Sequence, residues 1–251
     1  MAVEAYYDVT GDQHQAHYEW LYAAGYRLIS ISVYGSALDP RYAAVWVRRS
    51  GPQWRAVHGI SEFGYRSLVD QWGGEGYVPV LVSATGTVSS SGLDTVFAGV
   101  FERGIAGNWH AYTRLTEGPT TDPWAFRNQN AVAHTLGMIL RSATIYGIED
   151  DPRYAAIWHQ NWVQTKWQVN SFETEASHKA AFDAATQLPG VALAGYRASI
   201  VTLSDYHRYC SCFSDDFVGK WTARHGLTAS AYEEERQRQA APIRALPARS
   251  A

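Results

Sequence analysis

The chain has 251 residues, of which 46% are hydrophobic and 18% charged, so it is long enough for one large domain and is not disordered over most of its length. Its formal charge of −3 and isoelectric point near 6.3 offer no basic surface for DNA, RNA or an anionic membrane. Its apolar runs are far shorter than the roughly 20 residues that span a bilayer. We therefore expect neither a nucleic-acid partner nor a membrane partner.

The N-terminal segment, MAVEAYYDVT, lacks the basic and apolar regions of a secretory signal. It predicts a soluble, cytoplasmic protein, although secretion stays open. Residues 3–10 of this segment match residues 54–61 (WRAVHGIS) and are expected to form a strand.

Segments of helical periodicity alternate along the chain with groups of three short β runs. The first helical segment starts at a capping box, Thr10 to Gln13, and the third starts at Asp122-Pro123, an N-cap followed by a proline at N1. These segments end at glycines, namely Gly25, Gly73 and Gly137. Each unit is thus predicted to be one helix followed by three strands.

The same unit occurs four times. Four tryptophans at nearly equal spacing, each preceded by a related aromatic run such as YAAVWV (from Tyr42) or YAAIWH (from Tyr154), mark its third strand. The predicted organisation is one repeat domain, 1–240, with a strand at 3–10, repeats at about 11–61, 62–116, 122–174 and 175–227, and a helix at 228–240. Residues 241–251 are expected to be a flexible tail.

Tandem units of this kind predict an α+β fold in which a curved antiparallel sheet forms a half-barrel or closed barrel with the helices outside. In the first strand of each repeat, an aliphatic row that includes Ile29, Ile31 and Val33 is expected to pack on the helices. The opposite row is rich in hydroxyl groups and contains Ser30, Ser32, Tyr34, Ser83, Thr85, Ser142, Thr144, Tyr146 and Thr202. It is expected to line a concave site, with Ser32, Tyr34, Ser83, Thr85, Thr144 and Tyr146 as the ligand-binding residues.

The elements GYR…YG, PRYAAVW and WRAVHGIS make nearly the whole chain similar to the tandem repeats in the N-terminal half-barrel of fungal polyglycine hydrolases, also found as bacterial tandem repeat domains. In those enzymes the repeats precede a serine hydrolase domain with a Ser-x-x-Lys motif. This sequence contains neither Ser-x-x-Lys nor Gly-x-Ser-x-Gly. The resemblance therefore implies the fold but no covalent serine chemistry.

Two groups of residues are candidates for acid–base catalysis. His58 and His225 share one repeat position, where histidines would titrate near neutral pH; the alternative is a packing role. Glu102, Arg141 and His159 break the apolar pattern of neighbouring strands and would form a catalytic cluster. The alternative there is that Glu102 and His159 face solvent at strand ends while Arg141 extends past the helices.

Recurring rings give a further set of candidates. Trp46 and Trp158 would stack on a sugar or an apolar ligand, whereas their regular spacing also fits a core role. Cys210, Cys212 and His207 do not have the spacing of a four-ligand zinc site, so we expect no metal and no cofactor.

Three functions remain open from the sequence. The first and preferred one is a binding module for a small molecule, glycan or peptide. The second is an enzyme that performs cyclisation, isomerisation or hydrolysis in the same cavity, and the third is a scaffold that binds another protein. The oligomeric state is not predicted.

Overall fold

The computed structural model describes residues 2–87, 94–105, 107–186 and 197–215. The chain divides into two compact units, Met1–Phe217 and Val218–Ala251, and all described residues belong to the first unit. His225, the predicted helix at 228–240 and the predicted tail at 241–251 lie outside the described residues.

The elements follow the order strand, helix, strand, strand four times. The first group is β1 (Val3–Val9), α1 (Gly11–Ala23), β2 (Tyr26–Tyr34) and β3 (Arg41–Arg48). The second group is β4 (Trp54–Ile60), α2 (Glu62–Gly74), β5 (Tyr77–Gly86) and β6 (Thr95–Arg103). The third group is β7 (Trp109–Thr116), α3 (Phe126–Thr135), β8 (Met138–Ile148) and β9 (Asp151–Gln160). The fourth group is β10 (Trp167–Glu173), α4 (Glu175–Thr186), β11 (Arg197–Leu203) and β12 (Tyr209–Ser214).

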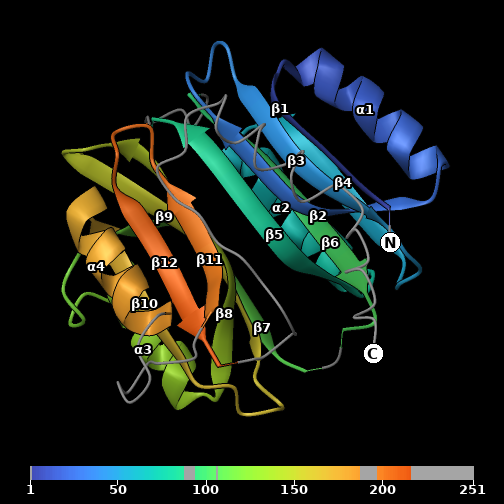
Figure 1. The fold of residues 1–251 in the computed structure, drawn as a ribbon. Helices are drawn as coiled ribbons and strands as arrows, with labels where there is room; N and C mark the ends of the chain where they lie inside the picture. The colour runs from blue at the N-terminus through green and yellow to red at the C-terminus, as the bar shows by residue number, and fades with distance from the viewer. Residues whose placement is uncertain (1, 88–93, 106, 187–196, 216–251) are drawn as a thin grey trace, which may run out of the picture. The chain divides into compact units, whose positions relative to one another are not determined.

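Each group forms its own three-stranded antiparallel sheet, with strand orders β1-β3-β2, β4-β6-β5, β7-β9-β8 and β10-β12-β11. The predicted α+β class with four repeats is confirmed, but the expected single curved sheet is divided into four. The hydrogen-bonded unit is also offset by one strand from the helix-first repeat, because the strand before each helix pairs with the last strand after it. The N-terminal strand is thus a full member of the first sheet (Figure 1).

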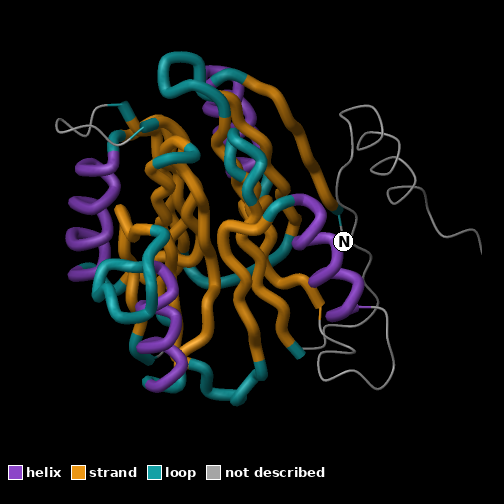
Figure 2. Tube along the Cα trace, turned by 90° about the vertical axis from the view of Figure 1, so that its left-hand side faces the viewer, coloured by secondary structure: helices purple, strands orange, loops and turns teal. Residues whose placement is uncertain are grey.

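The helices lie on the outside of the strands, as predicted (Figure 2). Thr10 and Gln13 form both arms of the capping box that begins α1. The third helix begins later than expected, at Phe126, because Asp122 caps a preceding turn: its carboxylate accepts from the Trp124 N–H and from the Thr116 hydroxyl. The strand that comes last in each group lies in the middle of its sheet, and most residues of β6, β9 and β12 are buried.

Alternation along these last strands connects one unit to the unit before it. In β9, Tyr154 and Trp158 pack in the core of their own unit. Ala155 and Ile157, on the other face, join the core of the second unit. The same division places Ala98 and Val100 of β6 in the core of the first unit, so small residues form each interface between units; Cys210 and Cys212 of β12 are the equivalent pair against the third unit.

Candidate functional site

The strands that directly follow the four helices, β2, β5, β8 and β11, are the first strands of the predicted repeats. They line one central cleft with a volume of about 730 Å³. These strands are each at the edge of a sheet, and β2 and β5, β5 and β8, and β8 and β11 lie side by side. The lining side chains are mainly hydroxyl and aliphatic groups, and include Ser30, Ser32, Tyr34, Ser83, Ser142, Thr144 and Thr202. The volume lies in the range of sites for small ligands.

A β-bulge in each first strand determines which side chains face this cleft. The register shifts at Ile29 in β2, at Val80 in β5 and at Arg141 in β8, which are equivalent positions. A bulge places two consecutive residues against one partner and so changes the face on which the next side chains lie. Ile29 is 39% exposed and Arg141 is also exposed, and both line the cleft instead of packing under the helices.

Several of the predicted hydroxyl groups bind the edge strands to each other. Ser83 Oγ accepts a hydrogen bond from the Val33 N–H in the preceding unit, at 2.9 Å. Ser142 Oγ accepts from the Val82 N–H at 3.0 Å and donates to the Val82 carbonyl at 3.3 Å. Thr144 does the same at Ala84. These hydroxyls take the place of a backbone ladder between sheets, which the alternation of the sequence did not predict.

Thr85 and Asp205 hold one end of the cleft together across three units. The Asp205 carboxylate accepts from the Gly35 N–H at 3.1 Å and from the Thr85 hydroxyl at 2.8 Å. Thr85 is only 2% exposed, so this predicted ligand-binding residue is buried in an interface between units. Asp205 belongs to the turn that follows β11, and it ties the fourth unit to the first two.

Tyr34 and Tyr146 occupy the same place in their units and support the same backbone feature. Their hydroxyls accept from the N–H groups of Asp8 and Arg114, each at 3.0 Å. Asp8 and Arg114 have positive φ values of 55° and 58°, an unusual conformation for residues other than glycine. Tyr34 also lines the cleft, whereas Tyr146 is buried against the second unit and burial raises its pKa.

Arg141 is the main charged group of the cleft. Among the described residues, no carboxylate lies within ion-pair distance of its guanidinium. The hydroxyls of Ser30, Ser32 and Thr202, in the same cleft, have no hydrogen-bond partner within the described part of the chain. Within the described ranges, the cleft therefore presents the Arg141 cation without a carboxylate partner and several hydroxyl groups without a hydrogen-bond partner.

His58 belongs to β4 and lies beside α1, away from this cleft. Its Nε2 is 2.8 Å from Gln15 Oε1, and its ring is edge-on to His14 with the ring centroids 4.6 Å apart. Burial lowers the pKa of His58, which favours the neutral ring. The equivalent Thr113 and Ser171 also bond the preceding helix, through Glu62 and Arg127, so this repeat position connects units and does not gather in one cavity.

Glu102 and His159 also connect consecutive units. Glu102 forms an ion pair with the buried Arg27 of the first unit, at 2.7 Å. His159 is 8% exposed, and its Nε2 lies 2.8 Å from the Pro79 carbonyl oxygen of the second unit. Burial is the main cause that lowers the pKa of His159; Arg141 lowers it further, while Glu102 and the Pro79 carbonyl raise it. The three predicted cluster residues are thus close enough to interact, but only Arg141 lines the cleft, and their catalytic roles remain predictions.

Trp46 and Trp158 are fully buried, at 0% exposure, in the cores of the first and third units. They are buried because they alternate with small residues along the last strand of each group, so that the large rings all lie on the face that packs on the unit's own helix. Their place is the core and not the cleft. In the described part of the chain, no group of three or more His, Cys, Asp or Glu residues is arranged to hold a metal ion.

Two residues of the cleft, Asp205 and His207, were not predicted from the sequence to belong to a ligand site. Asp205 and His207 lie in the turn between β11 and β12, and both line the cleft. The equivalent turns of the other units differ in sequence and length, so their convergence could only be found in space. Ser30 belongs to the predicted hydroxyl row and could have been chosen from it.

These features define a class: an α+β array of strand-helix-strand-strand units whose edge strands share a cleft. A family model described as "Polyglycine hydrolase-like, structural repeat" matches residues 1–49, 51–104, 136–161 and 218–240, which is more than half of the chain. The chain belongs to this family, as its resemblance in sequence implied. The fourth unit, residues 167–214, has the same architecture although the model does not match it. Among the described residues, no helix is long and apolar enough to cross a bilayer.

Proposed function

We propose that the protein is a binding module whose central cleft takes a small, hydroxyl-rich ligand that carries a carboxylate. Support for this proposal comes from the Arg141 guanidinium, which is exposed in a cleft of about 730 Å³ with no carboxylate partner in the described chain. A guanidinium matches a carboxylate with two parallel hydrogen bonds. The unused hydroxyls of Ser30, Ser32 and Thr202 would bind the polar groups of the same ligand.

The other charged groups of the cleft fit an anionic ligand. Asp205 is the acidic side chain among the described lining residues, and its two oxygens already accept hydrogen bonds from Gly35 and Thr85. His207 is exposed and lines the same cleft. Apolar contact would come from Ile29 and from Leu203, which is 47% exposed.

Titration calorimetry with matched pairs of probes tests this proposal. The pairs are glucuronate with methyl glucoside, and an N-acetylated tripeptide with a free C-terminal carboxylate against its amide. The charged member of a pair is expected to bind, and Arg141→Gln is expected to weaken that binding by about tenfold or more, since a charged hydrogen bond contributes about 1.5–3 kcal/mol. Arg48→Gln, at an exposed arginine at the end of β3, is the control and should bind like the parent protein.

Two results would overturn the proposal. One is that Arg141→Gln weakens the binding of the charged and the neutral member of a pair to the same extent. The other is unchanged affinity in Arg141→Gln. If none of the four probes binds, the carboxylate class is rejected for sugars and peptides of this size.

The enzyme alternative has less support in the geometry. Glu102, His159 and His58 all take part in contacts between units, and none of them lines the cleft. A bell-shaped dependence of a reaction rate on pH that disappears in His58→Ala would nevertheless contradict a purely binding role.

A further inference from the structure

Three of the helices lie beside the strand that precedes the next helix, and this arrangement produces three equivalent seams: α1 with β4, α2 with β7, and α3 with β10. Side-chain contacts mark each of them, through Gln15 and His58, Glu62 and Thr113, and Arg127 and Ser171. Because the three seams are repeats of one structure, differences between them show where the chain departs from simple packing.

The first seam is filled by aromatic rings. Tyr18 lies edge-on to Trp46 and Trp54, with ring centroids 5.7 and 5.8 Å apart. Tyr22 contacts Trp54 at 5.3 Å. These rings occupy the space between helix and strand, so apolar packing is sufficient to close a seam of this kind.

The third seam has polar residues at the same helix positions. His14 in α1 and Phe126 in α3 are equivalent, because each stacks on the first aromatic residue of the last strand of its group, Tyr42 of β3 or Tyr154 of β9, at 4.9 or 4.5 Å. Four and eight residues further on, α1 has Tyr18 and Tyr22, whereas α3 has Asn130 and His134. The strand residue Trp167, equivalent to Trp54, is retained and lies 5.9 Å from His134 between ring centroids.

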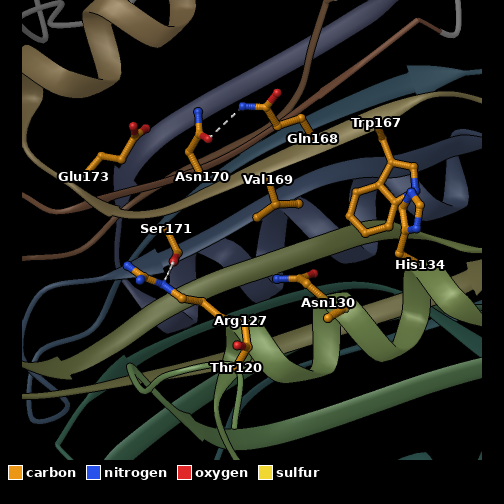
Figure 3. A pocket seen from close by; sticks show the side chains of 11 residues that line it. Thr120, Arg127, Asn130, His134, Trp167, Gln168, Val169, Asn170, Ser171 and Glu173 are labelled. Carbon is orange, nitrogen blue, oxygen red and sulfur yellow. Dashed lines mark hydrogen bonds between the residues drawn. The ribbon is translucent and has the colours of Figure 1, made fainter. Parts of the chain in front are cut away.

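A groove of about 480 Å³, which we call the α3/β10 groove, lies between α3 and β10 at these positions (Figure 3). Its lining residues are Thr120, Arg127, Asn130, Ala131, His134, Trp167, Gln168, Val169, Asn170, Ser171 and Glu173. Most of these are amide, hydroxyl or ring side chains, and the groove is open to solvent.

The amide of Asn130 is held in one orientation. The indole N–H of the buried Trp158 donates to Asn130 Oδ1 at 2.9 Å. Because an indole N–H is a donor only, the amide oxygen must face Trp158, and the NH₂ group with its two donors remains for the groove. Gln168 Nε2 donates to Asn170 Oδ1 at 3.2 Å, which leaves the Gln168 oxygen and the Asn170 NH₂ group out of that bond.

The charged residues of the groove do not favour an anion. Arg127 is paired with Glu117 at 2.7 Å and donates to Ser171. Glu173 has a buried oxygen, Oε2, without a hydrogen-bond partner among the described residues; it lies 3.8 Å from His178 Nδ1, beyond hydrogen-bond distance. With its cation paired and a carboxylate beside it, the groove offers no free positive charge among the described residues to an anionic ligand.

We infer that the α3/β10 groove is a second binding site, and that its ligand is a neutral sugar residue. A sugar ring has apolar faces that pack on an aromatic ring such as Trp167, and its hydroxyls both accept and donate hydrogen bonds. The NH₂ group of Asn130 would donate to a sugar oxygen. The central cleft, in contrast, has an unpaired cation, so the two sites would select different ligands.

The test uses the methyl glycosides of glucose, galactose, mannose and N-acetylglucosamine as probes, with tryptophan fluorescence and ligand-observed NMR as readouts. The parent protein is expected to bind at least one of them in a saturable manner. Trp167→Ala should weaken that binding by about tenfold, equivalent to about 1.4 kcal/mol. The control Trp20→Ala, at a tryptophan that is 62% exposed on α1, should leave it unchanged.

A second variant separates loss of the binding site from loss of folding. His134→Tyr restores the residue type of the first seam, so it is expected to fill the groove, abolish sugar binding and keep or raise the unfolding midpoint. Binding that persists in His134→Tyr would overturn the inference, as would failure of all four glycosides to bind the parent protein. Arg141→Gln should not affect this binding, which separates the groove from the central cleft.

Discussion

Replacing His14 by Phe should remove part of the protein's sensitivity to acid. His14 is 1% exposed, and its ring stacks on Tyr42 with the centroids 4.9 Å apart and the planes at 15°. The third unit places a phenyl ring, Phe126, on Tyr154 in the same way, at 4.5 Å and 3°. A phenyl ring therefore fits the space, and His14→Phe should fold.

The free energy of unfolding that is lost on acidification follows from the protonation of His14. Burial, and next the nearby His58 and His17, lower its pKa from 6.5 to about 3. Its Nδ1 lies 2.7 Å from the Tyr6 hydroxyl, which donates to the neutral ring. Because the folded-state pKa is below the unfolded value, the unfolded chain binds the proton first. The stability due to neutral His14 is therefore complete above about pH 6.5 and is lost as the pH falls toward about 3, with about 2 kcal/mol lost by pH 5.

Urea unfolding near pH 7.5 and near pH 5 measures this difference. At the higher pH, His14→Phe should be less stable by about 1 kcal/mol, because the hydrogen bond to Tyr6 is lost. On acidification, the parent protein should lose about 2 kcal/mol more than the variant. His58 and His159, whose pKa values burial also lowers, are present in both proteins and cancel. Equal losses in the two proteins would refute the reasoning.

Two further predictions concern contacts between units. Ser142→Ala removes both hydrogen bonds to Val82 and should destabilise the protein by about 1–3 kcal/mol. The Val82 amide should then exchange its hydrogen faster. Unchanged exchange would show that the hydroxyl does not protect this edge. Glu102→Gln should lower the free energy of unfolding in urea by about 1–3 kcal/mol, because the Arg27 side chain is only 8% exposed and loses its charged partner. A more stable variant would contradict the structural role of the pair.

The repeat, the α+β class and the positions of the helices could be predicted because periodicity and caps are local properties of the sequence. Thr10 and Gln13 form the predicted capping box. The assignment of strands to sheets could not be predicted in this way, because which strand pairs with β3 depends on hydrogen bonds between distant segments. For the same reason one curved sheet was expected where four separate sheets are found.

The candidate site was predicted in part. Ser32, Tyr34, Ser83, Thr144 and Arg141 do line one cleft. Bulges explain why Ile29 and Arg141 also line it, since one extra residue in a strand changes the face on which the following side chains lie. Alternation alone therefore could not show that Arg141 faces the cleft.

Pairs of hydroxyl and backbone groups, and not continuous ladders, connect the four sheets at the cleft. Each sheet consequently completes its own strand pairing without help from its neighbours. A strand in one unit could be lengthened, or a wall residue without such a bond, such as Ser30 or Thr202, exchanged, without shifting the register of the adjacent sheet. At those positions ligand specificity can change while the bonds between the units stay intact.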